Sequence, residues 1–279
     1  MMHPKGIGYW IAFPKILGTV DQIVARLLEV GADWVAPRGS DGRHESKDWT
    51  RAHTRACVDA GIPVYRWPFS RPGDIHHEVT LAEKWRSEGD SGFIVDAETP
   101  WAGCNRQAEI YGSELRRVLG HDHFIADAPW PFVHYHPEYP WHAFEAFVAA
   151  RMPQYYWTEI GLPFQSVCDT ADGSWRRYNQ SRPIYPIGVT YGAAELRRLG
   201  ATPCPSEIVP TDVQKFVDRY RARGCVSLYS LEAANSEVLD LLKPPKNKGQ
   251  EKIEPLPSFD SYPATPIGWE LHDNHEKPG

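Results

Sequence analysis

Residues 6–36, GIGYWIAFPKILGTVDQIVARLLEVGADWVA, contain two apolar runs with an amphipathic segment between them. The first run, residues 7–13, predicts a β-strand. Over residues 19–30 the apolar positions recur every three or four residues, which predicts a helix with one buried face. Gly31 ends that helix, and residues 33–36 predict a second strand. This order is typical of a β–α–β unit with parallel strands.

The same alternation continues along the chain, so we expect eight strand–helix units. The predicted strands span residues 7–13, 33–36, 63–67, 92–95, 123–127, 152–157, 184–189 and 225–230. The predicted helices span residues 19–30, 49–60, 77–88, 105–119, 144–150, 175–180, 210–223 and 236–242. Such a series predicts an α/β fold, the (β/α)8 TIM barrel. The alternative is a doubly wound sheet, but Gly6-Ile7-Gly8 lacks the third glycine of a dinucleotide-binding fingerprint.

Composition and charge argue against several classes of protein. The 279 residues suffice for a barrel in one domain. The formal net charge is −6 and the basic residues are scattered, so nucleic acid is not expected as a partner. No apolar run is long enough to span a membrane. The 5 cysteines lie far apart without a C-x-x-C pair, which indicates reduced thiols rather than disulfides or a zinc site.

The two ends of the chain differ from the predicted barrel domain, residues 1–243. Residues 1–6 lead directly into the first strand, so we expect synthesis in the cytoplasm without a signal peptide. If a phage encodes the protein, release from the cell or incorporation into the virion is the expectation. Residues 244–279 begin with a charged, proline-bearing stretch without periodicity, which predicts a linker and C-terminal tail. Its later apolar residues predict docking on the barrel or self-association with a second copy.

Two carboxylates, Asp96 and Glu98, follow the fourth predicted strand. Side chains alternate along a strand, so the two point the same way, roughly 6 to 7 Å apart. Burial and mutual repulsion would raise one pKa while the other group stays charged, as an acid catalyst beside a stabilising carboxylate requires. We expect Glu98 to be the acid, desolvated by Pro100 and Trp101, and Asp96 to stay ionised. The alternative is a helix cap beside a solvated loop residue.

Further candidates lie at the other predicted strand ends, where barrel active sites are found. Asp127 would supply a third carboxylate, or else cap a turn before Pro129. Glu159 and Glu232 are expected to be solvated. Aromatic and amide side chains would bind a sugar or fill the barrel interior, and these substrate-binding candidates are Trp67, Trp101, Gln154, Tyr156, Tyr191 and Tyr229.

Metal and cofactor chemistry are not expected. His134 and His136 are two residues apart in the loop after the fifth strand, a spacing that can share a metal. However, the first predicted strand, residues 7–13, carries no side chain that could bind a metal ion. A metal-dependent hydrolase would require the His134/His136 loop to fold over Asp127.

The segment GFIVDAE, residues 92–98, and the strand at residues 34–36 leading to Asp41-Gly42 resemble the family-25 glycoside hydrolases, lysozyme-like muramidases with a TIM barrel. The resemblance implies that Glu98 is the acid and Asp96 its partner. The chain departs from that family because its first strand carries no aspartate. The family-18 chitinases also end their fourth strand in D-x-E and use the substrate's acetamido group as nucleophile. Their upstream aspartates are replaced here by Ser91 and Ile94.

We therefore expect a glycoside hydrolase-like protein that cleaves a β-linked amino-sugar polymer by carboxylate acid catalysis without a cofactor, and peptidoglycan is the polymer we expect. The alternative is a catalytically silent barrel that binds glycan or serves as a structural component, for example of a phage particle. The missing aspartate of the first strand and the apolar tail favour that alternative.

Overall fold

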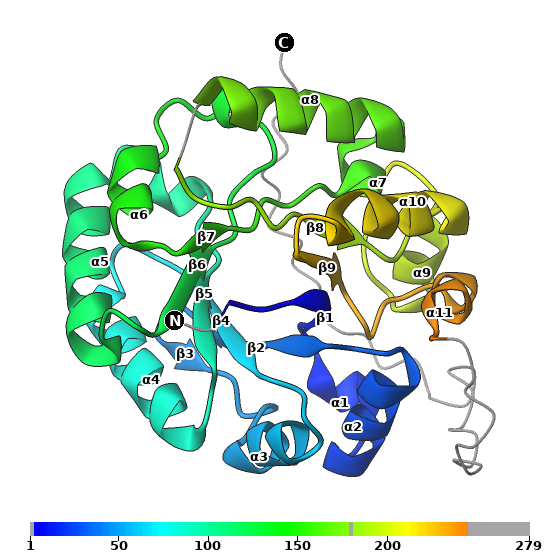
Figure 1. Cartoon of the computed structure of the whole chain (residues 1–279), viewed down its shortest axis with the longest axis horizontal. Coiled ribbons are helices and arrows are strands. Elements are labelled where there is room, and N and C mark those ends of the chain that lie inside the picture. The colour runs from blue at the N-terminus through cyan, green and yellow to red at the C-terminus, as the bar shows by residue number, and fades with distance from the viewer. Residues whose placement is uncertain (1–2, 179–180, 245–279) are drawn as a thin grey trace.

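The computed structural model describes residues 3–178 and 181–244. Figure 1 shows its strands in a central ring with the helices outside. The strands are β1 (Gly6–Ile11), β2 (Trp34–Asp41), β3 (His44–Glu45), β4 (Tyr65–Phe69), β5 (Gly92–Val95), β6 (Phe124–Asp127), β7 (Ala150–Arg151), β8 (Ile187–Val189) and β9 (Cys225–Tyr229). Neighbours pair in the order β7-β6-β5-β4-β2-β1-β9-β8, and β3 pairs with β2 as a short antiparallel addition.

The ring closes between β7 and β8 through a proline-interrupted seam. Two isolated parallel bridges, Arg151 with Ile184 and Gln154 with Ile187, join the two segments. Pro153 lies within one segment and cannot donate a backbone hydrogen bond, so the ladder is not continuous. With this closure the strands form the (β/α)8 barrel that the sequence predicts.

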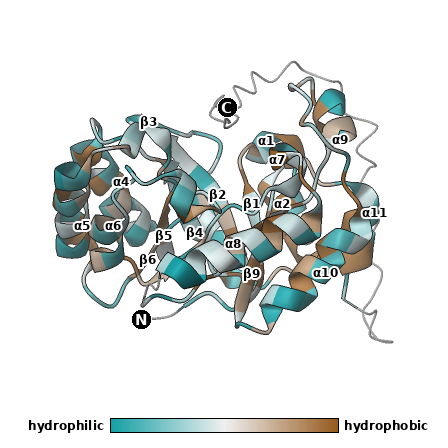
Figure 2. Ribbon diagram, turned by 90° about the horizontal axis from the view of Figure 1, so that it is seen from above, coloured by the Kyte–Doolittle hydropathy of each residue, from teal (hydrophilic) through white to brown (hydrophobic). Residues whose placement is uncertain are grey.

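Amphipathic helices cover the outside of the ring. They are α1 (Pro14–Leu17), α2 (Val20–Glu29), α3 (Arg51–Asp59), α4 (Ile75–Glu88), α5 (Asn105–Leu119), α6 (Trp141–Phe147), α7 (Trp157–Ile160), α8 (Phe164–Tyr178), α9 (Ala193–Arg198), α10 (Pro210–Arg221) and α11 (Ser236–Leu242). Figure 2 shows mixed apolar and polar residues on α5 and α10. Thr19 and Gln22 form a capping box that starts α2. Gly89 ends α4 with a left-handed φ of 112°.

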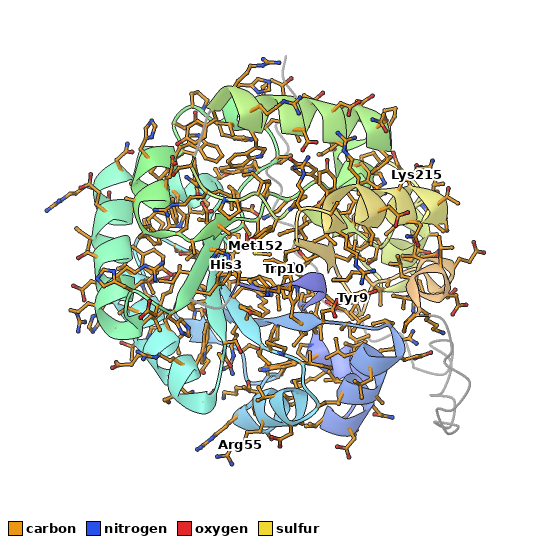
Figure 3. All side chains as sticks on the ribbon, viewed as in Figure 1. His3, Tyr9, Trp10, Arg55, Met152 and Lys215 are labelled. Carbon is orange, nitrogen blue, oxygen red and sulfur yellow. The ribbon has the colours of Figure 1, made fainter. Side chains whose placement is uncertain are left out.

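The barrel interior is filled by aromatic side chains from the first strands. Trp10, Trp34 and Trp67 belong to one buried cluster, and the Trp10 indole donates a hydrogen bond to Ser227 Oγ at 3.0 Å. Figure 3 shows Trp10 and Met152 within the ring, whereas Arg55 lies at the periphery. Gly8 makes room for this filling, because a Cβ there would lie 2.0 Å from the Trp34 ring. The interior is therefore a packed core, as in other TIM barrels.

Several predicted elements need correction around the sixth and seventh units. The helix predicted at 144–150 begins earlier, as α6 (Trp141–Phe147), and residues 150 and 151 are strand β7. The strand predicted at 152–157 contains Pro153 and is largely irregular. Of the short helix predicted at 175–180, residues 175–178 are the end of the long α8 (Phe164–Tyr178), and residues 179 and 180 lie outside the described residues. The short helices α1, α7 and α9 and the hairpin with β3 have no counterpart in the sequence prediction.

Within residues 3–178 and 181–244, every helix is too short or too polar to cross a membrane. Helix α11 ends at Leu242, close to the boundary predicted at residue 243. The predicted tail, residues 244–279, lies outside the described residues except for Pro244, so its docking or self-association stays a prediction.

Candidate active site

Asp96 and Glu98 lie where the chain leaves β5 at the mouth of the barrel. Ile94 faces the interior, whereas Val95 and Ala97 belong to the core between sheet and helices. The alternation along an extended chain therefore turns Asp96 inward, and Asp96 forms a parallel bridge with Phe69 of β4. Asp96 is buried and Glu98 is half-buried. Glu98 is thus the member of the acidic pair that lies nearer to solvent.

The Gln154 side chain ties the two carboxylates together across the barrel mouth. Its amide nitrogen lies 2.9 Å from Asp96 Oδ1, 3.1 Å from Glu98 Oε1 and 2.9 Å from the Ala128 carbonyl oxygen. Both acids lie within hydrogen-bonding distance of one donor, which confirms that they share a face. Gln154 comes from the seam between β7 and β8, so the pair is held by a strand from another part of the barrel.

The environment raises the pKa of Asp96 well above its usual range. Burial is the largest cause and the negative charge of Glu98 the next, while Arg38 opposes both. Ionisation of Asp96 is therefore less favourable than expected from the sequence, because the inner carboxyl loses its hydration while the outer one keeps part of it. Burial and the neighbouring negative charge favour the protonated form of Asp96 over a wider pH range than for a free carboxyl group.

Two tyrosines form a wall beside the acidic pair. Tyr156 and Tyr229 are half-buried, and their rings stack with centroids 5.4 Å apart. Burial raises the pKa of both hydroxyls well above the usual range, so both remain protonated hydrogen-bond donors. Tyr191 packs edge-on against Tyr229 but is itself fully buried, and its hydroxyl donates to Glu159. Of the three predicted tyrosines, Tyr156 and Tyr229 are the accessible ones.

Asp127 lies on the opposite face of its strand from the acidic pair. Its neighbours Ala126 and Ala128 face the barrel interior, so Asp127 points outward toward the helices. There Arg151 donates to Asp127 Oδ2 at 2.5 Å, and both side chains are 0% exposed. Burial raises the pKa of Asp127, and the charge of Arg151 opposes that effect. The structure gives Asp127 a place in a buried ion pair and does not bring it to the barrel mouth.

The two predicted tryptophans also lie away from solvent. Trp101 is 0% exposed, stacks on Tyr111 with centroids 5.4 Å apart, and donates to the Ser70 carbonyl oxygen at 3.1 Å. It belongs to the core between sheet and helices and does not desolvate Glu98 from the cleft side. Trp67 fills the barrel interior, where its indole donates to the Ala36 carbonyl oxygen at 2.9 Å.

Two further charged residues lie at strand ends, although neither was predicted to act in catalysis or to bind substrate. Arg38 of β2 points into the barrel mouth, where its guanidinium lies 5.7 Å from the Trp67 ring centroid and donates to Asp41 at 2.9 Å. Arg38 is two residues after Ala36 and four after Trp34, so it shares their inward face of the strand. This spacing is the sequence signal that could have identified Arg38 as a site residue. Glu232, expected to be solvated, is 0% exposed.

The Glu232 side chain lies at the end of the first strand, β1. Its Oε1 accepts hydrogen bonds from the backbone N–H groups of Ala12 and Phe13 at 2.8 and 3.1 Å. Burial raises its pKa to about 7. A carboxyl group therefore lies at the end of β1 after all, although it comes from the segment that follows β9.

The histidines of the loop after β6 contact other side chains. His134 Nδ1 lies 2.9 Å from Ser174 Oγ, and the His136 ring stacks on Trp130 with centroids 3.9 Å apart. In the part of the chain that the structure describes, no group of three or more His, Cys, Asp or Glu side chains is arranged to hold a metal ion.

The sequence matches no protein-family model and no curated protein. Solved structures do resemble the fold. A chitinase from Chromobacterium violaceum has a TM-score of 0.61 at 13% identity, covering 85% of this chain and 98% of that one. The spore cortex-lytic enzyme SleL of Bacillus megaterium has a TM-score of 0.59 at 8% identity, covering 85% and 73%.

A family-18 N-acetylglucosaminidase from Paenibacillus barengoltzii has a TM-score of 0.58 at 8% identity, covering 85% of this chain and 98% of that one. Nothing in these likenesses supports the resemblance to the family-25 muramidases. At such low identity the likeness is one of fold alone. The chain has the (β/α)8 barrel fold that several glycoside hydrolases also have.

Proposed function

We propose that this protein is a glycoside hydrolase that cleaves a β-linked amino-sugar polymer, with Glu98 as the general acid and Asp96 as its partner. The observation that carries the proposal is the acidic pair at the carboxyl end of β5, held by the Gln154 amide. In a TIM barrel this end of the strands is where active sites are built.

The geometry of the pair favours one variant of glycoside hydrolysis. Both carboxylates come from one strand, so they approach the sugar from the same side instead of flanking it as a separate nucleophile and acid would. In the substrate-assisted route, Glu98 protonates the glycosidic oxygen and the bond from that oxygen to C1 breaks. The carbonyl oxygen of the substrate's own acetamido group bonds to C1. A water molecule then gives a proton to Glu98 and its oxygen to C1, releasing the acetamido group.

The raised pKa of Asp96 supports this assignment. Asp96 holds a proton at a pH at which a free aspartate would have lost it, so the site contains a protonated carboxyl group beside Glu98. Glu98, nearer to solvent, is the member that can deliver the proton to a bound glycan. Tyr156 is within electrostatic reach of both acids and, protonated, can donate a hydrogen bond to the substrate.

The similar folds support the choice of an amino-sugar polymer. Two of the compared proteins are named as a chitinase and an N-acetylglucosaminidase, and a third as a cortex-lytic enzyme. We propose peptidoglycan as the polymer, following the expectation from the sequence, with chitin as the other amino-sugar polymer to be tested.

The test is hydrolysis of purified peptidoglycan glycan strands and of chitin oligosaccharides by the full chain, measured as new reducing ends. Glu98→Gln should lower the rate about 10²- to 10⁴-fold, since general acid catalysis contributes that much. Glu114→Gln is the matched control, because Glu114 lies on α5 away from the barrel mouth and pairs with the exposed Arg117. Wild-type turnover by Glu98→Gln would contradict the assignment. Glycan binding without hydrolysis by the wild-type protein would favour the catalytically silent barrel.

A further inference from the structure

Arg38 places a positive charge in the mouth of the barrel, beside the acidic pair. It continues the inward face of β2 after Trp34 and Ala36. The charge of Arg38 lowers the pKa of Asp96 and of Tyr229 against the effect of burial, so the guanidinium lies within electrostatic reach of both. Nevertheless, no hydrogen bond joins Arg38 to Asp96 among the described residues. Arg38 therefore lies at the barrel mouth without a hydrogen bond to Asp96.

Among the described residues, the hydrogen bonds of Arg38 use one of its N–H donors. One N–H group, on Nη2, donates to Asp41 Oδ2, and 23% of the side chain is exposed. Asp41 Oδ1 accepts two hydrogen bonds from Arg71, the second residue after β4, at 2.9 and 3.2 Å. Two arginines thus share one carboxylate, so this group of three carries a net charge of about +1. A guanidinium has five N–H donors, and the side that does not face Asp41 remains for a ligand.

The position of the guanidinium is fixed in advance. It lies 5.7 Å from the centroid of the buried Trp67 ring, an arrangement that orients the planar group through a cation–π contact. Because Asp41 holds one edge and Trp67 one face, little freedom is lost when a second carboxylate binds. At the end of the neighbouring strand β4, the Arg71 guanidinium likewise lies 5.1 Å from the centroid of the Phe69 ring.

A fixed arginine with an open edge suits a planar anion, because guanidinium and carboxylate form two parallel hydrogen bonds. A neutral polymer would shield the Arg38 guanidinium from water without supplying a hydrogen-bonded negative charge, which makes the free energy of binding less favourable. We propose that Arg38 forms a subsite for a carboxylate of the glycan, so that the cleft takes acidic amino-sugar polymers in preference to neutral ones. This inference rests on the proposed function, because it names the substrate class of the same cleft. The carboxylate can belong to the lactyl group of muramic acid or to a uronic acid.

Binding by full-length protein carrying Glu98→Gln separates this inference from the hydrolytic reaction. Three glycans of matched length are compared by calorimetry: peptide-free peptidoglycan strands, an alternating N-acetylglucosamine–glucuronic acid polymer, and neutral chitin oligosaccharides. The first two distinguish the two sources of the carboxylate. We expect at least one acidic glycan to bind about 10- to 100-fold more tightly than the neutral one, as a charged hydrogen-bonded pair implies. The preference should decrease with added salt.

Adding Arg38→Gln should abolish the preference by weakening acidic binding while leaving chitin binding nearly unchanged. Arg38→Lys, which keeps the charge but not the fork, should retain a part of it. Arg117→Gln, which removes an equal charge from the exposed surface of α5, should leave the preference intact.

Equal affinity of the parent protein for acidic and neutral glycans would overturn the inference. So would a preference that survives Arg38→Gln, or an equal loss of affinity for all three glycans, which would show that Arg38 only positions the acidic pair. If the wild-type protein hydrolyses none of the three glycans but an Arg38-dependent preference is measured, the carboxylate subsite is supported and the proposed hydrolase function is overturned. Binding of no glycan would overturn both.

Discussion

The buried ion pair of Asp127 and Arg151 allows a direct separation of structural from catalytic roles. Both side chains are 0% exposed, and Arg151 also donates to the Trp141 carbonyl oxygen at 2.6 Å. Asp127→Asn keeps the shape of the side chain but removes its charge. The Arg151 guanidinium is then buried without a counter-charge, which in comparable pairs costs about 3–5 kcal/mol. That is a large part of the roughly 5–15 kcal/mol of stability typical of a folded protein.

The measurement is urea unfolding followed by tryptophan fluorescence. Trp141 and Trp175 are suitable reporters, because the Arg151 guanidinium lies 5.8 and 6.0 Å from their rings. The double variant Asp127→Leu/Arg151→Met removes both charges and should recover most of the loss, to within about 1–2 kcal/mol of the parent.

Activity per folded molecule completes the test. A structural role predicts that folded Asp127→Asn retains the parental rate. The reasoning is refuted if this variant unfolds at the same urea concentration as the parent while its activity falls by two or more orders of magnitude.

Three further predictions concern other buried groups. Trp101→Ala should lower the free energy of unfolding by about 3–5 kcal/mol in a thermal or urea melt, with glycan affinity unchanged, because Trp101 packs in the core; weakened binding at unchanged stability would instead place it in the cleft. Glu232→Gln should unfold at a higher temperature than the parent above pH 7, with the difference shrinking toward pH 4.5. The folded pKa of about 7 exceeds the unfolded value of 4.5, so parental stability is greatest below pH 4.5 and falls by about 3 kcal/mol as the pH rises through 7; parallel stability–pH curves of the two proteins would contradict this. Gly8→Ala should cost about 1–3 kcal/mol in urea unfolding, because its Cβ would lie 2.0 Å from the Trp34 ring; an unchanged midpoint would show that the ring moves freely.

The order of strands and helices was predictable from the sequence because each unit carries its own periodicity. The acidic pair was predictable for the same reason, since two residues separated by one position in a strand share a face. The period of two also gives the direction of Arg38, once Trp34 and Ala36 are assigned to the interior. These inferences need only local geometry.

The predictions that failed required knowledge of packing between distant segments. Asp127 stands at a strand end, but its outward direction depends on Ala126 and Ala128 facing the interior, and its partner lies on the next strand. Trp101 follows a turn whose direction the sequence does not reveal. The raised pKa of Asp96 depends on its burial and is opposed by Arg38 and Gln154, which come from distant parts of the sequence.

The seam between β7 and β8 determines how firmly the acidic pair is held. Four backbone hydrogen bonds join the segments there, two of them accepted by Pro153 and Pro183, which have no N–H to return. Gln154 sits in this seam. Local separation of the two segments would withdraw the Gln154 amide from both carboxylates while the surrounding helices stay folded, so the lifetime of the site geometry follows the local opening free energy. Exchange with deuterium of the amide protons that hydrogen-bond across the seam would report that lifetime; they belong to Arg151, Tyr155, Tyr185 and Ile187.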